Sequence, residues 1–291
     1  MSELINCINN LSAKDIIKSI AKTANGMPFY LQTSGLGGFC PEYQIVYDAY
    51  VGTIPDATQA AAQNAMVCAL VAAGVWAKLD TLHIFANGDS PNCLLNWMNP
   101  GTLDASLFNA PLFTSWEGIT GNGSTQYIDS NFNPTTSGVN FIKDSASQII
   151  YIRTDINTLT GHGIYLSLPA DYQIVPRSDA NVAYIRTNDL SNLSVANANG
   201  TGMYVNTRTA AAVNKLYRNK VAIINGTSAS VDLVNDNFFY LARNNDGVPF
   251  AHRADQISMC AHGGGLSQVD VDNFTDIFEI YMVFLGKGVI P

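Results

Sequence analysis

The chain has few charged side chains. Only 13% of its 291 residues are Asp, Glu, Lys or Arg, about half of the usual share of roughly 25%. The formal net charge is −8, and the densest basic group, Lys215, Arg218 and Lys220, falls in a predicted hairpin. Because a nucleic-acid-binding surface needs clustered Lys and Arg, we expect no nucleic-acid partner.

Long hydrophobic runs are also missing. No apolar stretch reaches the roughly 18 residues of a membrane span. The segment 1–6 has neither the basic nor the apolar region of a secretory signal peptide. We therefore expect no membrane insertion, and we expect the protein to leave a cell by lysis or within a particle if it acts outside.

The cysteine content is low and irregular. The count is odd and no CxxC motif is present, a pattern that does not match a zinc site or a disulfide framework. We expect free, mostly buried thiols, as in a protein of the reducing cytosol. We also expect no cofactor and no metal. The cysteines are Cys7, Cys40, Cys68, Cys93 and Cys260.

Catalytic motifs are absent as well. The sequence contains no HExxH, no GxSxG and no P-loop. Retaining glycosidases need two carboxylates roughly 5 Å apart, but the nearest pair, Asp276 and Glu279, falls in a predicted C-terminal helix. We expect that pair to form a solvated helix surface, and we predict that the protein is not an enzyme.

Residues of three further types are site candidates. His162 stands between two glycines and His262 precedes three; exposed turns are the favoured interpretation for both. Trp97 is ambiguous between a core residue and a platform for stacking sugars. Calcium ligands could come from loop aspartates, although no calcium motif joins them; these are Asp179, Asp189, Asp236 and Asp246.

What the sequence does contain is a series of strand-like segments. Apolar and polar residues alternate in segments such as 202–209, 221–226 and 256–261, and Asn-Gly or Asp-Gly pairs separate several of them. Alternation with such turns predicts antiparallel strands in a two-sheet sandwich. We expect a mainly β jelly roll over 82–291, closed by a C-terminal helix that ends near Leu285.

The N-terminal part has a different character. Ser12 and Asp15 form a capping box for a predicted helix over 12–24, and 26–47 is predicted to be an extended arm. Asp56 caps a second predicted helix over 57–73. We therefore divide the chain into an anchoring arm (1–45), a helical connector (46–81) and the sandwich (82–291). The predicted anchoring residues are Ile16, Ile17, Ile20, Phe29 and Tyr30.

Several segments resemble a known group of proteins. The segment 73–86 reads AGVWAKLDTLHIFA, and 117–134 begins EGITGNGSTQYID. Two later segments are FYLARNNDG (239–247) and ISMCAHGGGLS (257–267). Together they resemble, in the same order, the fibre and appendage proteins of bacteriophages that infect Bacteroides-type hosts, including crAss-like phages. The resemblance spans roughly 50–291.

The resemblance implies a concanavalin A-like (laminin-G-like) jelly roll and a structural role in the virion. The expected protein is a head or tail fibre or a decoration subunit, made in the host bacterial cytoplasm. Its N-terminus would bind other virion proteins, its sandwich would face host surface glycans, and by analogy it would be a homotrimer. The alternative is a carbohydrate-binding or glycan-cleaving protein.

Overall fold

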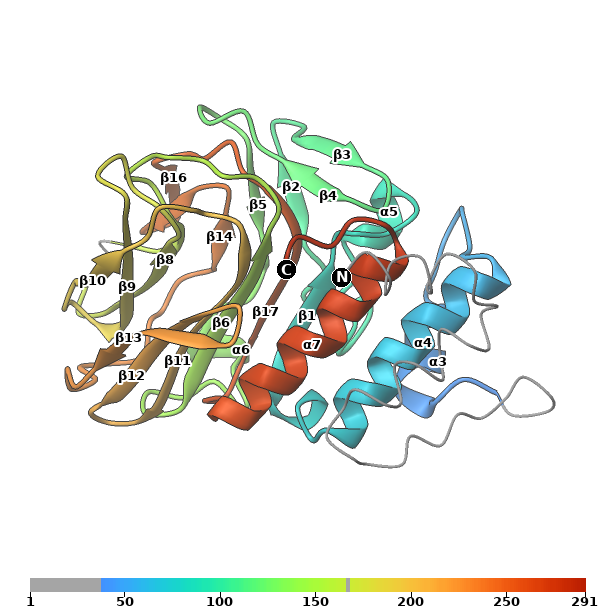
Figure 1. The fold of residues 1–291 in the computed structure, drawn as a ribbon, viewed down its shortest axis with the longest axis horizontal. Helices are drawn as coiled ribbons and strands as arrows, with labels where there is room; N and C mark the ends of the chain where they lie inside the picture. The colour runs from blue at the N-terminus through green and yellow to red at the C-terminus, as the bar shows by residue number, and fades with distance from the viewer. Residues whose placement is uncertain (1–37, 166–167) are drawn as a thin grey trace.

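The computed structural model describes residues 38–165 and 168–291. Within these residues, two β-sheets pack face to face, and helices cover the outer face of one of them (Figure 1). In the described part of the chain, all strand pairs are antiparallel except one, in which β15 runs parallel to β7. The predicted mainly β antiparallel sandwich with a closing C-terminal helix is therefore confirmed.

The first sheet has eight strands in the described part of the chain. Strand β1 pairs with β17 beside the main path. The path runs in the order β13 (Val221–Gly226), β12 (Val213–Arg218), β11 (Gly202–Ala210), β6 (Ala146–Ile152), β17 (Gln256–Gly263), β4 (Gly118–Thr120) and β3 (Leu112–Thr114), and β1 is Leu79–Ile84.

The second sheet has nine strands, counted over the same residues. Strand β15 pairs with both β7 and β16, beside the main path. The path runs in the order β10 (Leu193–Ala196), β9 (Val182–Asp189), β8 (Asp171–Val175), β7 (His162–Ile164), β14 (Phe239–Tyr240), β5 (Tyr127–Asp129) and β2 (Ser106–Phe108), with β15 at Arg243–Asn245 and β16 at Val248–Phe250.

The two faces of the eight-stranded sheet bury different cores. Alternation along β6 sends Ile150 and Ile152 into the core between the sheets, where Tyr172 and Ile185 meet them from the other sheet. Neighbouring side chains of the eight-stranded sheet point the other way, into a core shared with the helices. The helices thus pack against the outer face of this sheet.

The helices begin where their caps predict. Asp56 accepts hydrogen bonds from the backbone N–H groups of Thr58 and Gln59, and Ser267 forms a capping box with Asp270. Helices α4 and α7 lie side by side (Figure 1). No helix in 38–165 or 168–291 is long and apolar enough to cross a membrane. The elements are α3 (Pro41–Asp48), α4 (Ala57–Ala72), the 3-10 turn η1 (Trp76–Lys78), α5 (Ser90–Cys93), α6 (Pro134–Ser137) and α7 (Gln268–Phe284).

The structure corrects the prediction of an extended arm over 26–47 where that range is described. Residues 41–48 form helix α3, because Pro41 starts a helix well and one helical face carries Tyr43 and Val46 into the core. The predicted boundary between 45 and 46 therefore falls inside a packed helix. The predicted helix over 12–24 and its capping box lie outside the described residues.

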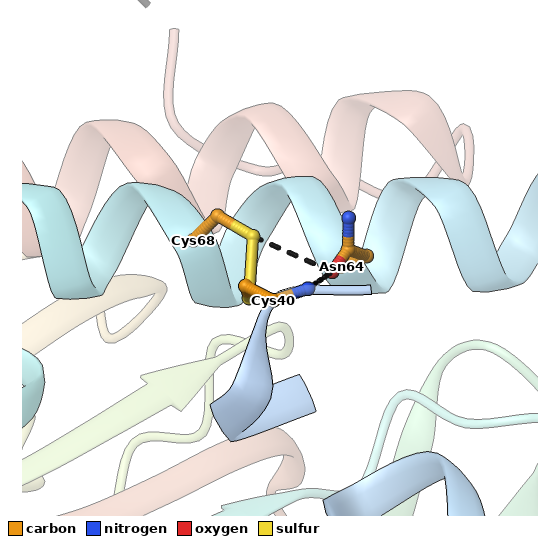
Figure 2. Close-up of a disulfide and its surroundings, with 3 residues drawn as sticks. All are labelled: Cys40, Asn64 and Cys68. Atoms are coloured by element: carbon orange, nitrogen blue, oxygen red, sulfur yellow. Dashed lines mark hydrogen bonds between the residues drawn. A yellow bond between two sulfur atoms is a disulfide. The ribbon is translucent and has the colours of Figure 1, made fainter. Parts of the chain in front are cut away.

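The prediction of free thiols is also wrong for one pair of cysteines. Cys40 and Cys68 form a disulfide, with their Cα atoms 6.1 Å apart (Figure 2). The backbone N–H of Cys40 also donates to Asn64 Oδ1 on α4, at 2.9 Å. The bond forms because the start of α3 docks on the middle of α4, a contact that the spacing of 28 residues does not reveal. Cys93 and Cys260 are free and buried, as expected.

Candidate functional site

The outer face of the nine-stranded sheet carries a hollow of about 390 Å³. Side chains of β8, β9, β15 and β16 contribute to it, together with the loop that precedes β7. The lining residues are Leu159, Thr160, Tyr165, Gln173, Val175, Tyr184, Arg186, Asn192, Arg243, Phe250 and Ala251.

The alternation of side chains along β8 determines which of them form the floor of the hollow. In β8, Ile174 points into the core between the sheets, so its neighbours Gln173 and Val175 face outward. The register sets Arg186 of β9 opposite Gln173 and sets Gln173 opposite Gly163 of β7. Arg243 of β15 is in turn opposite Gly163. Because glycine has no side chain, nothing from β7 separates Gln173 from Arg243 in this row.

Aromatic rings and two guanidinium groups also line the hollow. The guanidinium carbons of Arg186 and Arg243 lie 4.7 and 4.6 Å from the centre of the Tyr165 ring, within the range of a cation–π interaction. The Phe250 ring is nearly parallel to that of Tyr165, with 6.4 Å between the ring centres. Phe250 and Leu159 remain 44% and 54% exposed, so they form an apolar rim.

Four polar atoms that belong to the lining are buried without a hydrogen-bond partner among the described residues. They are Gln173 Oε1, Thr160 Oγ1, Arg186 Nε and Arg243 Nε. A buried polar atom left unsatisfied costs roughly 1–3 kcal/mol. The walls of the hollow therefore contain two donors, an acceptor and a hydroxyl group whose hydrogen-bonding capacity the described residues leave unused.

A buried ionic group holds the loop that forms one wall. Arg253 donates to the carbonyl oxygens of Ile156 and Thr158, at 3.1 and 3.0 Å, and forms an ion pair with Asp255. His162 Nδ1 accepts the N–H of Leu241, so the ring is protonated on Nε2, which donates to Asp255 at 3.0 Å.

The pKa values agree with this assignment. Burial lowers the pKa of His162, and Asp255 only partly opposes that effect, so the ring stays neutral. Burial acts to raise the pKa of Asp255, but Arg253 and the hydrogen bond from His162 outweigh it and leave this pKa below its usual range. The Asp255 carboxylate therefore remains charged and keeps the wall loop fixed through Arg253.

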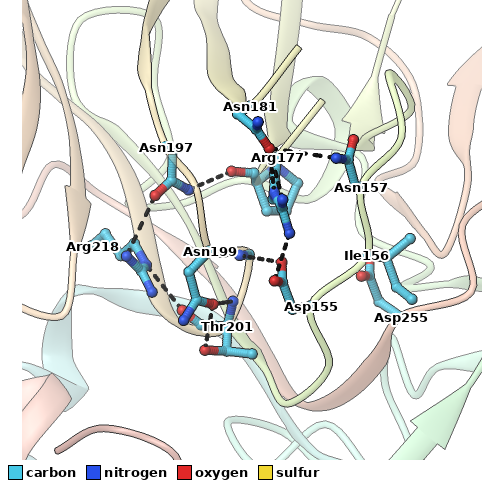
Figure 3. A network of polar contacts seen from close by, with 12 residues as sticks. Asp155, Ile156, Asn157, Arg177, Asn181, Asn197, Asn199, Thr201, Arg218 and Asp255 are labelled. Atoms are coloured by element: carbon cyan, nitrogen blue, oxygen red, sulfur yellow. Dashed lines mark hydrogen bonds and ion pairs between the residues drawn. The ribbon is translucent and has the colours of Figure 1, made fainter. Parts of the chain in front are cut away.

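A second polar network holds the start of the same loop (Figure 3). Arg177 pairs with Asp155 at 2.5 Å and also donates to Asn181. Asp155 accepts the N–H of Gly200 at 2.7 Å. The wall of the hollow is thus anchored at Asp155 as well as along its length, so it is largely formed before a ligand arrives.

The histidines and the tryptophan that were site candidates from the sequence do not line the hollow. His162 and His262 are fully buried, so the expectation of exposed turns is wrong for both. His262 contacts Thr81 and Tyr240 inside the sandwich, at 2.8 Å each. Trp97 is 1% exposed and belongs to the core beneath the helices, which removes it as a sugar platform.

The carboxylates that were catalytic or calcium-binding candidates from the sequence are not grouped into such a site in the described residues. Asp276 is exposed and pairs with Lys220, as expected of a solvated surface. Glu279 differs: it is partly buried and accepts a hydrogen bond from Tyr151. In the described residues, no group of three or more His, Cys, Asp or Glu is placed to hold a metal ion. Asp189, one of the calcium candidates, is buried in an ion pair with Arg208. The other three candidates are Asp179, Asp236 and Asp246.

The predicted anchoring residues cannot be placed, because all of them lie outside the described residues. They are Ile16, Ile17, Ile20, Phe29 and Tyr30. The residues that do line the hollow, above all Gln173, Arg186 and Arg243, were not predicted. They lie in three separate strands, and only the outward positions within a strand could have been inferred from the sequence.

Comparison with known proteins identifies the fold but no family. No family model and no curated protein matches the chain. A sialidase of Trypanosoma rangeli bound to a difluorinated sugar acid aligns with 12% identity and a TM-score of 0.52, over 70% of this chain and 33% of the sialidase. Domain 4 of an extracellular arabinanase from Geobacillus stearothermophilus, bound to arabinotriose, aligns with 16% identity and a TM-score of 0.45, over 68% and 98%. The chain thus spans about a third of the sialidase.

Proposed function

We propose that the protein is a non-catalytic carbohydrate-binding module that holds a saccharide in the hollow on the nine-stranded sheet. The observation that carries this proposal is the combination of an apolar rim with four unsatisfied polar atoms. Saccharides have apolar ring faces and many hydroxyl groups, and binding sites for small ligands pair hydrophobic walls with a few placed polar groups.

Binding is favoured over hydrolysis by the composition of the hollow. None of its lining residues is an aspartate or a glutamate, whereas most glycosidases need two carboxylates beside the bond that they cleave. The solved sialidase is bound to a sugar analogue; at such low identity it supports the fold alone.

A glycan array with three forms of the protein tests the proposal. Wild type should bind a defined set of saccharides. Gln173→Leu removes the amide at the floor but keeps a similar volume, and it should weaken binding at least tenfold, about 1.4 kcal/mol. Lys215→Gln, on the other sheet, is a control substitution outside the hollow and should bind as wild type does. Failure of wild type to bind any glycan, or equal binding by Gln173→Leu, would contradict the site.

Absence of hydrolysis needs its own measurement. The glycans that bind should be incubated with wild type and their reducing ends counted. We expect none to be released above the buffer control. Release at an enzymatic rate, lost in Gln173→Leu, would instead establish the glycan-cleaving alternative.

We further propose that this module is displayed on a bacteriophage particle, as a fibre or decoration subunit of the head or tail, and that it forms a homotrimer. The support is the resemblance of the segments 73–86, 117–134 and 239–247 to virion proteins. Mass spectrometry of purified particles tests the location, and light scattering tests the trimer.

Because α3 and Cys40 belong to the core, the truncation that tests anchoring should remove 1–37 rather than 1–45.

A further inference from the structure

Arg243 differs from the other buried arginines of the described chain. Three arginines are buried there: Arg208, Arg243 and Arg253. Arg208 pairs with Asp189 at 2.8 Å, and Arg253 pairs with Asp255. Arg243 is only 7% exposed, yet among the described residues its guanidinium has no ion-pair partner. Buried charges are normally paired, so this one is poised for a charge that comes from outside the fold.

Arg186 offers a second donor beside it. One terminal nitrogen of Arg186 binds the buried carboxylate of Asp171, but its Nε remains unsatisfied, as does Nε of Arg243. Both guanidinium groups contact the same ring, Tyr165, and the charge of Arg186 acts on Arg243, so one anionic group in the hollow would interact with both. Two positive charges and the one negative charge of Asp171 leave this part of the hollow with an excess of one positive charge, which a single anionic group would neutralise.

The unsatisfied atoms also define the rest of the ligand. Gln173 Oε1 can accept a hydrogen bond but cannot bind an anion, so it requires a donor such as a sugar hydroxyl. The exposed faces of Phe250 and Leu159 suit the apolar face of a sugar ring. A ligand that satisfies all of these groups has an anionic substituent on one side and a hydroxyl group on the other.

We propose that the hollow binds an acidic saccharide, whose carboxylate lies between Arg243 and Arg186 and whose hydroxyl group donates to Gln173. This rests on the proposed carbohydrate-binding function and specifies its ligand class. A planar carboxylate matches the donor fork of a guanidinium group well. No covalent step is involved, and the ligand leaves unchanged.

Isothermal titration with paired probes tests the inference on the wild-type protein. The pairs are 3′-sialyllactose with lactose, and trigalacturonic acid with its methyl ester. In at least one pair, the acidic sugar should bind at least tenfold more tightly than its neutral counterpart. Its affinity should also fall as salt is raised, because part of the attraction is between charges.

Two variants locate the effect. Arg243→Gln should weaken binding of the acidic probe at least tenfold while changing the affinity for its neutral counterpart less than twofold. Lys215→Gln removes the same charge from the other sheet and should change neither affinity. Thermal unfolding of each variant confirms that it is folded before binding is measured.

Each negative result would overturn a different part of the two proposals. Equal affinity for acidic and neutral probes, with both lost in Gln173→Leu, would overturn the acidic ligand and leave the carbohydrate-binding function in place. Tighter binding of 3′-sulfolactose than of either carboxylated probe would overturn the carboxylate assignment. Failure of every acidic and neutral glycan to bind would overturn both proposals.

Discussion

Replacement of Arg243 by methionine should make the free protein more stable while it abolishes binding of acidic sugars. Burial lowers the pKa of the Arg243 guanidinium to about 10. Each tenfold change in a protonation equilibrium corresponds to about 1.4 kcal/mol, so the charged form costs the fold about 3 kcal/mol. The substitution removes this cost, but relaxation of the structure around the methionine offsets part of the gain. We therefore expect a net gain of roughly 1–3 kcal/mol in the free energy of unfolding.

The sign follows from proton linkage. The pKa of this base is lower in the folded protein than in the unfolded chain, so the penalty is complete below pH 10. It disappears only as the pH rises from about 10 through the unfolded pKa. At pH 7 the whole penalty is present. Urea unfolding of wild type and Arg243→Met at that pH therefore measures the net gain with the penalty fully present.

Arg208 provides the matched control, because it is also buried but has a partner. Arg208→Met would leave Asp189 buried without its counter-charge, and breaking such a pair typically costs about 3–5 kcal/mol. The two substitutions are chemically identical and should change stability in opposite directions. A loss of more than about 1 kcal/mol in Arg243→Met would refute the reasoning, drawn from residues 38–165 and 168–291, that the Arg243 charge has no ion-pair partner.

Three further outcomes follow from the described contacts. Reduction of the Cys40–Cys68 bond, which closes a segment of 28 residues, should lower the free energy of unfolding by about 3–4 kcal/mol in urea titrations; an equal midpoint with and without reductant would contradict the bond. Burial lowers the pKa of His83 to about 4, so stability should fall by up to about 3 kcal/mol as the pH drops from about 6.5 to 4. The variant His83→Gln should make that slope shallower but not abolish it, because burial also lowers the pKa values of His162 and His262; parallel slopes would show that His83 does not contribute. Arg253→Gln should speed amide hydrogen exchange in 156–160 and weaken acidic-sugar binding at least tenfold; unchanged exchange would mean that Arg253 does not hold the loop.

The sequence predicts the sandwich well because its information is local. Alternation fixes which side chains of a strand face the core, and the caps at Asp56 and Ser267 mark the starts of α4 and α7. The sandwich begins slightly earlier in the structure than predicted, because β1 begins at Leu79 rather than near 82. Such small differences arise because strand ends depend on pairing with β17, which is remote in sequence.

The candidate site is not predictable in the same way, because its parts come together only through the sheet register. Gln173, Arg186 and Arg243 lie on three strands, and β15 joins the sheet by a parallel pairing with β7 that no turn in the sequence indicates. An arginine in a strand is usually solvated, so Arg243 does not stand out until its burial, and the absence of an ion-pair partner for it among the described residues, are known.

His162 shows how a local pattern can mislead. Flanking glycines favour an exposed turn, but here they permit close packing of β7. Gly163 has a φ of +118°, and a Cβ atom at this position would lie 2.3 Å from the carbonyl oxygen of Tyr172. The glycines thus allow the strands to approach, and the histidine between them becomes buried beside Asp255.

The central claim is that the hollow on the nine-stranded sheet is the saccharide site. A crystal structure of the wild-type protein with 3′-sialyllactose tests this most directly. We predict that the sugar carboxylate lies within hydrogen-bond distance of the guanidinium groups of Arg243 and Arg186, and that a hydroxyl group reaches the side chain of Gln173. A sugar bound on another surface of the protein, with the hollow empty of ligand, would contradict the account.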